Sequence, residues 1–423
     1  MPLAPDLLAE AFAVTVLRQK PGLTVQAIDA ALECSGPRAW NPLLRAVVDL
    51  HALGRLGAIE SWLVSLLQQR PADELVTIEA LIPERSVALA RIAVILGERQ
   101  LQAMPVAPGA DAERARILNN LGGRYSALGR RKEALGATER AAKVYERLAK
   151  QNPDTFEPDL ASSLNNLGVR YSELGRREEA LGAAERAVAI RERLAKHNPD
   201  ASEPNLAMCL NNLAVRYSAL GRREEALGAA ERAAEIYERL AKQNPDAFDS
   251  DLAASLNNLG NSYSALGRRE EALGAAKRAS EMYEPLARQN PEAFEPDLAS
   301  SLNNLGGRYS EVGRREEALG AAERAAAIRE RLAKRNPDAF EPDLATSLGT
   351  LGNIWRQESP GPAMNAFKRG VETLRRLFLG DPKTFARLMA DLVNDYSKAC
   401  ESSGEKPDAD LLAPIVQALE KLS

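Results

Sequence analysis

The stretch LNNLGGRYSALGRRKEALGATERA, residues 118–141, decides the fold because it recurs almost letter for letter along the chain. Its first leucine recurs at a spacing of 46 residues, at Leu118, Leu164, Leu210, Leu256, Leu302 and Leu348. A fixed period of this length is typical of an array in which each unit packs only against its neighbours. The sequence therefore predicts a repeat array rather than one compact globule.

Each unit is predicted to be a pair of helices, here called helix A and helix B. In the second unit, one face of helix A carries Leu164, Leu167, Gly168, Tyr171 and Leu174. We expect this helix from about residue 158 to residue 174, where Gly175 ends it. The inner face of helix B carries Ala180, Leu181, Ala184, Ala187, Val188 and Leu194. Helix B is expected to stop near residues 198–200, with Pro204 in the first turn of the next helix A.

The order of these residues resembles a known family. The pattern L-x-x-L-G-x-x-Y, then G, E-A-L, A-x-x-R-A and N-P-D is similar to the tetratricopeptide repeat over about residues 112–355. The 46-residue period and the LNNL element resemble its kinesin-light-chain and nephrocystin-like variety. The resemblance implies an all-α fold, a right-handed α-solenoid in which the A helices line a concave groove.

The chain outside the array is expected to be helical as well. Residues 1–105 are out of register and indicate an irregular helical region, which ends in a degenerate capping hairpin at residues 80–101. Residues 106–357 form the array, and residues 358–423 a diverged C-terminal cap. Residues 5–17 and the helices after them resemble the sensor region of bacterial signal-transducing (STAND) NTPases. Because no GxxxxGK[ST] phosphate loop is present, the resemblance implies a fragment or relative without the ATPase.

The composition argues against several classes of partner. Lys and Arg number 55 against 59 Asp and Glu, so no basic field attracts nucleic acid or an anionic membrane. No unbroken apolar run of about 18 residues indicates a membrane span. Cys34, Cys209 and Cys400 lie far apart, which argues against disulfides or a zinc site and favours a reducing, cytoplasmic location.

The sequence offers little for catalysis. Its two histidines, His51 and His197, are far apart and out of repeat phase, so we expect no enzyme activity, no cofactor and no metal site. Arginine doublets recur in the turn between helices A and B, at residues 130–131, 176–177, 222–223, 268–269 and 314–315. Acidic residues follow each doublet, which favours an ion-paired, solvated edge over a phosphate or nucleic-acid site.

A stripe of helix A beside the core face is the predicted ligand-binding groove. Its asparagines are Asn119, Asn165, Asn211, Asn257 and Asn303. Four residues further lie Gly123, Val169, Val215, Asn261 and Gly307, and seven residues further lie Ser126, Ser172, Ser218, Ser264 and Ser310. Amides both donate to and accept from a peptide backbone. The alternative is that the asparagines join adjacent A helices, which we favour for the second of each pair, Asn120, Asn166, Asn212, Asn258 and Asn304.

Differences between the copies add secondary candidates. Arginines before the tyrosine, Arg124, Arg170, Arg216 and Arg308, favour a ligand with some acidic character. One position of helix A is Glu173 or Glu311 in two copies and alanine in the others. The two copies with glutamate have Arg191 or Arg329 on helix B, where the copies with alanine have tyrosine. We attribute this pairing to shared ancestry. The fourth copy alone has Asn261, Ser262, Lys277 and Pro285. Pro285 predicts a local bend in helix B, with drift after duplication as the alternative.

Three functions fit these observations. The first is a non-enzymatic scaffold that binds a peptide or protein segment in the groove of the A helices. The second is the ligand-sensing part of a signalling NTPase or effector. The third is a structural array that self-associates through its nearly identical repeats.

Overall fold

The chain folds entirely into helices in the part that its computed structural model describes: residues 40–41, 44–45, 47, 63–68, 70–82, 89–105, 108–356 and 359–422. Every regular element within these ranges is a helix, which confirms the predicted all-α class. The segment 5–17, Cys34 and His51 lie outside them. The chain divides into two compact units, residues 1–202 and 203–423, and each is described by itself.

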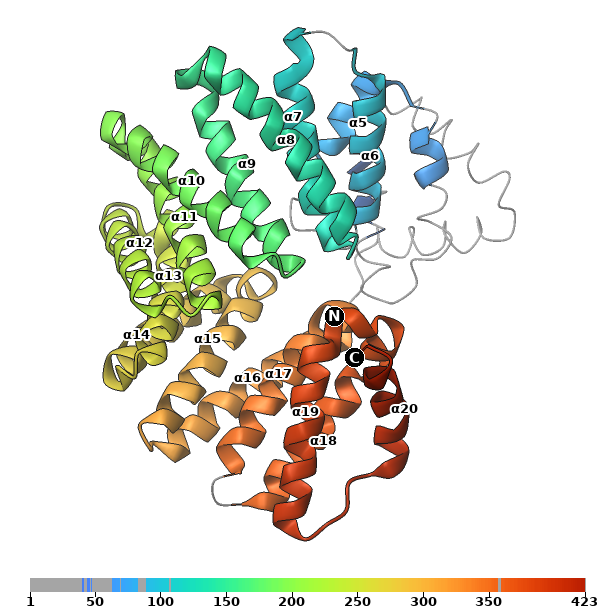
Figure 1. Cartoon of the computed structure of the whole chain (residues 1–423), viewed down its shortest axis with the longest axis vertical. Coiled ribbons are helices and arrows are strands. Elements are labelled where there is room, and N and C mark those ends of the chain that lie inside the picture. Colours follow the sequence, from blue (N-terminus) through green and yellow to red (C-terminus); the bar gives the residue numbers. More distant parts are fainter. Residues whose placement is uncertain are drawn as a thin grey trace. The chain divides into compact units, whose positions relative to one another are not determined.

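The repeat unit is a hairpin of one A helix and one B helix (Figure 1). The A helices are α7 (Asp111–Ala127), α9 (Pro153–Glu173), α11 (Pro199–Ala219), α13 (Pro245–Ala265), α15 (Pro291–Glu311) and α17 (Pro337–Trp355). The B helices are α8 (Arg131–Gln151), α10 (Arg177–His197), α12 (Arg223–Gln243), α14 (Arg269–Gln289), α16 (Arg315–Arg335) and α18 (Pro360–Gly380).

The A helices begin earlier than the sequence predicted. Helix α9 starts at Pro153, and Asn152 caps it, its Oδ1 accepting a hydrogen bond from the Thr155 backbone N–H at 3.4 Å. Asparagine is a good N-cap and proline suits the first helical position. The placement of Pro158 and Pro204 in a first turn is therefore wrong, because both lie inside their helices. Each removes one backbone donor near the helix start, where water can satisfy the carbonyl that is left.

Glycine ends the first five A helices as predicted. Gly175 has φ 73°, a left-handed conformation that glycine adopts without steric cost. Its N–H donates to the Ser172 carbonyl at 3.0 Å, and the Arg176 N–H donates to the Tyr171 carbonyl at 2.9 Å. This pair of bonds satisfies the last carbonyls of α9 and turns the chain into α10.

Small residues let the two helices of a hairpin approach closely. A Cβ added at Gly168 of α9 would come within 3.1 Å of the Ala180 carbonyl oxygen of α10. Ala180, Ala184 and Ala187 of α10 are buried against this face. The predicted pairing of large side chains on helix A with alanines on helix B is thus present in the structure.

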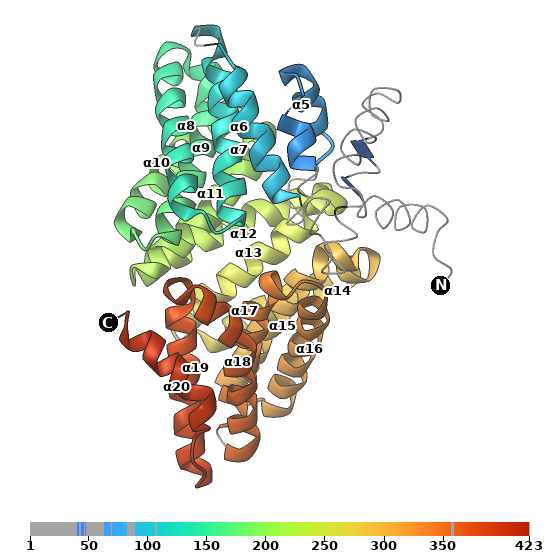
Figure 2. The same cartoon turned by 90° about the vertical axis from the view of Figure 1, so that its right-hand side faces the viewer.

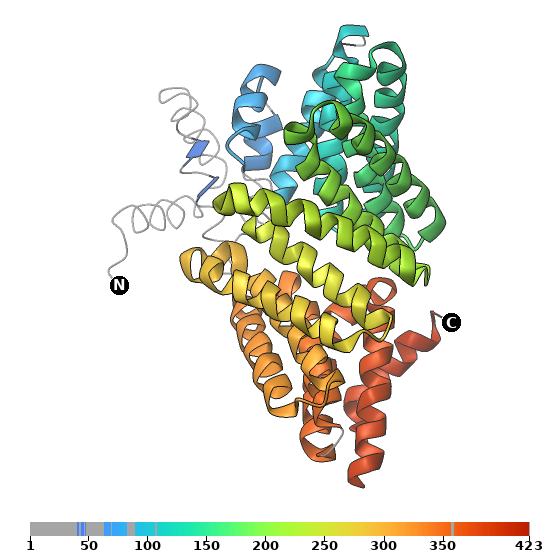
Figure 3. The ribbon, with the colours of Figure 1, turned by 90° about the vertical axis from the view of Figure 1, so that its left-hand side faces the viewer.

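Neighbouring hairpins share their cores within residues 203–423. One buried cluster contains Ala253 of α13, Tyr283 of α14, Leu302 of α15 and Ile328 of α16. Figure 3 shows these yellow and orange helices packed in succession. Each hairpin thereby covers the apolar edge of the next, which is the arrangement expected of a solenoid.

Two further helices precede the first A helix, and the second of them packs against it. These are α5 (Ala72–Glu79) and α6 (Ala90–Ala103), and a short 3-10 turn, Pro108–Ala110, leads into α7. Val94 of α6 is buried in one cluster with Ile117, Leu118 and Leu121 of α7. The apolar face at this end of the array is therefore covered.

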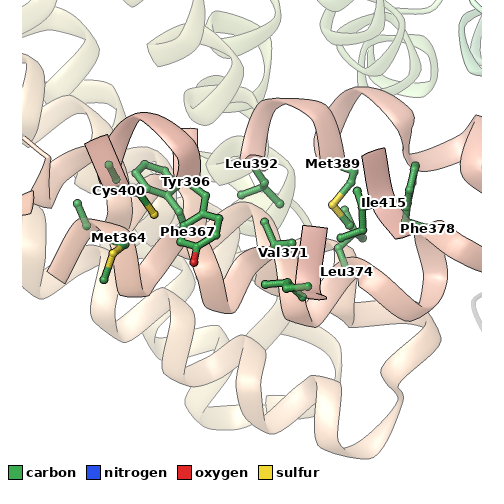
Figure 4. Close-up of a cluster of buried hydrophobic side chains, with 14 residues drawn as sticks. Met364, Phe367, Val371, Leu374, Phe378, Met389, Leu392, Tyr396, Cys400 and Ile415 are labelled. Carbon is green, nitrogen blue, oxygen red and sulfur yellow. The ribbon is translucent and has the colours of Figure 1, made fainter. Parts of the chain in front are cut away.

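The C-terminal end closes on larger side chains. Helices α19 (Pro382–Ser403) and α20 (Ala409–Glu420) follow α18 (Figure 2). Phe367 and Phe378 of α18 are buried with Met389 and Tyr396 of α19 and Ile415 of α20 (Figure 4). Because α17 and α18 pair as a sixth hairpin, the expected boundary at residues 357–358 falls between its two helices.

Candidate functional site

Two of the first asparagines, Asn211 and Asn257, accept hydrogen bonds from the next A helix. The Ser255 hydroxyl of α13 donates to Asn211 Oδ1 of α11 at 3.1 Å, and Ser301 of α15 donates to Asn257 of α13 at 3.2 Å. For Asn211 and Asn257 the structure thus shows the alternative that the sequence favoured less, a ladder that joins A helices. Asn165 is buried, with 6% of its surface exposed. A ligand-binding role of these amides stays a prediction.

Two of the serines seven residues further, Ser126 and Ser264, form a second link between A helices. Ser126 of α7 donates to Glu173 of α9 at 2.8 Å, and Arg170 pairs with the same carboxylate at 2.9 Å. The fifth hairpin repeats this cluster, since Ser264 donates to Glu311 at 3.0 Å and Arg308 pairs with Glu311 at 2.9 Å. Burial lowers the pKa of Arg170, and Glu173 partly offsets the effect. Both clusters hold neighbouring hairpins in register.

The exposed part of the predicted stripe is narrower than the sequence indicated. In residues 203–423, Val215 of α11 is 42% exposed, and Ser218 and Asn261 are also exposed. Gly123 is exposed as well, whereas Val169, Ser172, Gly307 and Ser310 are half-buried. An exposed valine beside polar and small side chains offers both an apolar contact and hydrogen bonds to a bound chain.

The four arginines that precede the tyrosine differ in their bonding partners. Arg124 donates to the Ala93 carbonyl at 2.9 Å and pairs with Glu79 at 2.6 Å. It therefore fastens α5 and α6 to α7, which the sequence did not predict because Glu79 is far away in the chain. Arg170 and Arg308 pair within their own helices. Arg216 is half-buried on α11.

The sequence did not predict that one buried position of helix B, occupied by arginine or tyrosine, bonds helix B to helix A. Arg191 donates to the Pro158 carbonyl at 2.8 Å and to Ser162 Oγ at 2.6 Å. In the third hairpin the Tyr237 hydroxyl donates to the equivalent Pro204 carbonyl at 3.2 Å. Arginine and tyrosine thus have the same bonding role, and Glu173 bonds to Ser126 and Arg170 rather than to Arg191. The signal in the sequence was Ser162, because serine accompanies arginine here and again at Ser300 and Arg329.

The first arginine of each doublet forms an ion-paired edge, as predicted. The Arg176 guanidinium stacks over the Tyr171 ring at 4.4 Å and bonds Glu179. The same stacking recurs in Arg130–Tyr125, Arg222–Tyr217, Arg268–Tyr263 and Arg314–Tyr309. The Arg176 guanidinium lowers the pKa of Glu179 through this hydrogen bond, so the arginine charge is neutralised locally.

Chemistry-bearing side chains are scattered through the described ranges. Within them, no group of three or more His, Cys, Asp or Glu residues is placed to hold a metal ion. Cys209 and Cys400 are buried free thiols, and His197 ends α10 in an exposed position. None of the helices searched there is long and apolar enough to cross a bilayer. The expected absence of enzyme activity stays a prediction.

Comparison with known proteins agrees with the geometry of the hairpins. The tetratricopeptide repeat family matches residues 114–154, 160–200, 206–246, 252–284 and 298–338. These segments lie in five of the six hairpins. Among curated proteins, none matches this sequence.

Several solved structures are similar to parts of this chain. BtubC (BKLC) from P. vanneervenii is 24% identical, with a TM-score of 0.44, over 59% of this chain and 91% of that one. A Podosopora anserina putative kinesin light chain with nearly identical TPR-like repeats is 23% identical, with a TM-score of 0.39, over 53% and 98%. A Rap protein complexed with Competence and Sporulation Factor is 15% identical, with a TM-score of 0.48, over 86% and 97%. Similarities at this level carry no information about a ligand of this chain.

Proposed function

The chain is a tetratricopeptide repeat protein, and on that premise we propose that its A helices bind an extended segment of a partner peptide or protein. Repeat arrays present long surfaces to other molecules, which supports an interaction scaffold in general. The finer proposal concerns which face of the hairpins is used and by what kind of ligand.

The observation that carries the proposal is the exposed stripe on α11 and α13. Val215 offers an apolar contact with 42% of its surface exposed. Ser218 and Asn261 are exposed polar side chains on the same stripe. An extended chain needs this mixture, because its backbone donors and acceptors require partners while its side chains require apolar contacts. The asparagine ladder beneath, with Ser255 bonded to Asn211, holds the two A helices in register.

The face opposite this stripe is less suited to an extended chain. On the outer face of the B helices, charged side chains already pair between hairpins, as Arg278 does with Glu238 at 2.9 Å. A ligand there would have to displace ion pairs that are already formed. Exposed ion pairs of this kind contribute little to stability, but they occupy charged side chains that a ligand could otherwise bind.

Site-specific crosslinking tests the proposal. A photoreactive phenylalanine analogue replaces Val215 or Asn261 in separate variants, and replaces the exposed Glu235 of α12 in a matched control. Lysate of the host is irradiated with each variant, and crosslinked peptides are identified by mass spectrometry. The proposal expects one partner segment crosslinked at both A-helix positions and absent at residue 235. Crosslinks that are equally abundant at all three positions would contradict it.

The interpretations as a signalling sensor and as a self-associating array stay predictions. Crosslinks between copies of this chain from residues 215 and 261 would favour self-association over a foreign ligand. Concentration-dependent mass in sedimentation, measured alongside, separates the two outcomes.

A further inference from the structure

One hairpin lacks an ion pair that the other five contain. In each of those five, an arginine of helix B pairs with a carboxylate near the start of its own helix A. The pairs are Arg147–Asp111 at 2.6 Å, Arg193–Glu157 at 2.6 Å, Arg239–Glu203 at 2.5 Å, Arg331–Glu295 at 2.7 Å and Arg376–Glu341 at 3.0 Å. In the fourth hairpin the carboxylate is Asp249 and the arginine position is Pro285. Proline supplies neither a charge nor a donor.

Asp249 occupies a position that is partly shielded from solvent. In the five paired hairpins the equivalent carboxylate side chains are only 17–21% exposed. Asp249 is also half-buried, and within the described ranges it has no ion pair. Burial raises its pKa, and the nearby Asp246 raises it further. A half-buried carboxylate without a counter-charge is unfavourable, so a cation from outside would be stabilised there.

A cavity of about 400 Å³ lies next to this carboxylate. Leu252 of α13 and Met282 of α14 provide apolar lining, whereas Lys242 and Glu238 come from α12. All of these residues belong to the unit of residues 203–423. The cavity is large enough for a long side chain together with some of its flanking backbone.

The other charged groups of the cavity do not neutralise Asp249. Arg278 is bonded to Glu238 at 2.9 Å, and Glu281 lies 3.8 Å from Lys277. Lys242 is exposed, and no ion pair joins it to Asp249 in the part of the chain described. The lining therefore contains one half-buried carboxylate with an open cation position.

We propose that the fourth hairpin binds an arginine side chain of a partner protein, with its guanidinium at Asp249 and its methylene groups against Leu252 and Met282. The partner thereby supplies the cation that Pro285 removes from the hairpin. Arginine fits better than lysine because its planar guanidinium binds a carboxylate with two parallel hydrogen bonds, and its stem packs on apolar surface. Five hairpins of this chain use arginine at the same point. The site uses α12, α13 and α14 and none of the exposed stripe residues.

The test uses two pools of synthetic twelve-residue peptides with randomised flanks. The central residue is arginine in one pool and citrulline, which has the same shape without the charge, in the other. The full chain is immobilised, and the retained fraction of each pool is measured. We expect the wild type to retain the arginine pool about tenfold more than the citrulline pool, as one charge-assisted pair in a cavity implies.

Three variants assign this preference to the fourth hairpin. Asp249→Asn removes the carboxylate charge, and Pro285→Arg restores the internal partner, so both are expected to abolish the preference. Glu295→Gln changes the equivalent carboxylate of the fifth hairpin, where Arg331 already pairs, and is expected to keep it. Circular dichroism confirms helix content, and Asp249→Asn serves alone if Pro285→Arg fails to fold.

The outcomes are distinct from those that test the stripe. Val215→Asp on α11 is expected to leave the arginine preference unchanged, because Val215 is not part of the cavity lining. No preference in the wild type, a preference retained by Asp249→Asn, or an equal loss in Glu295→Gln would each overturn the proposal.

Discussion

At the scale of single residues, glycine serves two different purposes in one hairpin. Gly175 ends α9 with φ 73°, a conformation that strains any residue with a Cβ. Gly182 lies inside α10, and a Cβ there would meet nothing within 4 Å. The first glycine is needed by the backbone, whereas the second only weakens the helix.

The two glycines therefore respond in opposite directions to the same substitution. We expect Gly175→Ala to lower the free energy of unfolding by about 1–2 kcal/mol. Gly182→Ala is expected to raise it by about 0.8–1 kcal/mol, as alanine does in an exposed helix interior. Urea titration followed by circular dichroism measures both. A loss of stability in Gly182→Ala would reveal a contact that this structure does not contain.

The carboxyl of Asp249 predicts a dependence of stability on pH. Burial raises its pKa in the folded protein. The folded state then holds the proton more tightly than the unfolded state, so the contribution to stability is complete below the unfolded pKa and is lost as pH rises through the folded pKa. We expect Asp249→Asn to be more stable than the wild type at pH 7 and equal to it near about pH 3.5.

The matched variant behaves in the opposite way. Glu295→Gln breaks the pair with Arg331 and is expected to lower stability at pH 7, by less than about 1 kcal/mol because the arginine is exposed. Urea midpoints at the two pH values measure both effects. A destabilising Asp249→Asn at pH 7 would mean that this carboxylate has a cationic partner within the chain.

Sequence reasoning at this scale was limited by ambiguity between similar signals. The glycine after helix A had one physical interpretation, and the structure confirms it. The start of helix A had two possible interpretations, because Pro153 and Pro158 both suit the first turn of a helix. Asn152 as the cap decides for Pro153, and a cap depends on backbone geometry that the sequence does not display.

At the scale of elements, helix B is fastened to helix A by a side chain that differs between copies. Arg191 and Tyr237 each donate to the carbonyl of the interior proline of their own helix A. Because both donors reach the same acceptor, the two residue types are interchangeable in principle. The copies differ in sequence without differing in helix bounds, since α10 and α12 are each 21 residues long.

Substitutions of Arg191 test this equivalence. Arg191→Ala leaves Ser162 Oγ without its donor and removes one donor from the Pro158 carbonyl, which still accepts from the Ser162 hydroxyl. We expect it to lower the free energy of unfolding by about 1–3 kcal/mol. Arg191→Tyr should cost less than half of that. Arg193→Ala is the control, at less than about 1 kcal/mol, since it breaks an exposed pair. Equal losses in the alanine and tyrosine variants would contradict the shared role.

The local bend that Pro285 predicts in helix α14 stays a prediction. Its bounds, Arg269–Gln289, match those of the other B helices, although Pro285 lies inside it. The missing backbone donor leaves one turn without its hydrogen bond. We expect amide deuterium exchange at residues 281–290 to be faster than at residues 235–244 of α12. Equal exchange in the two segments would contradict the bend that Pro285 predicts.

At the scale of the whole molecule, the period predicts most of what the structure contains. Repetition every 46 residues predicts the hairpins, their length and their shared cores. The repeat period predicts the candidate binding site less well. The helical periodicity places Asn211 on the face of helix A beside the core, but it does not indicate that Ser255 of the next A helix bonds to it. A signal was present, since serine follows this asparagine by 44 residues in most copies, with Cys209 as the exception. Within residues 203–423, the solvent-exposed members of the stripe are therefore Val215, Ser218 and Asn261 rather than the whole ladder.

The central claim is that the exposed stripe of the A helices holds a partner segment. The most direct test is quantitative affinity capture from host lysate with the wild type, a Val215→Asp and Asn261→Asp double variant, and a control with Glu235→Lys on α12. All three positions are exposed, so the variants are expected to fold alike. The account predicts a partner whose retained amount falls about tenfold or more in the stripe variant and is unchanged in the control. Equal retention by all three proteins would contradict it.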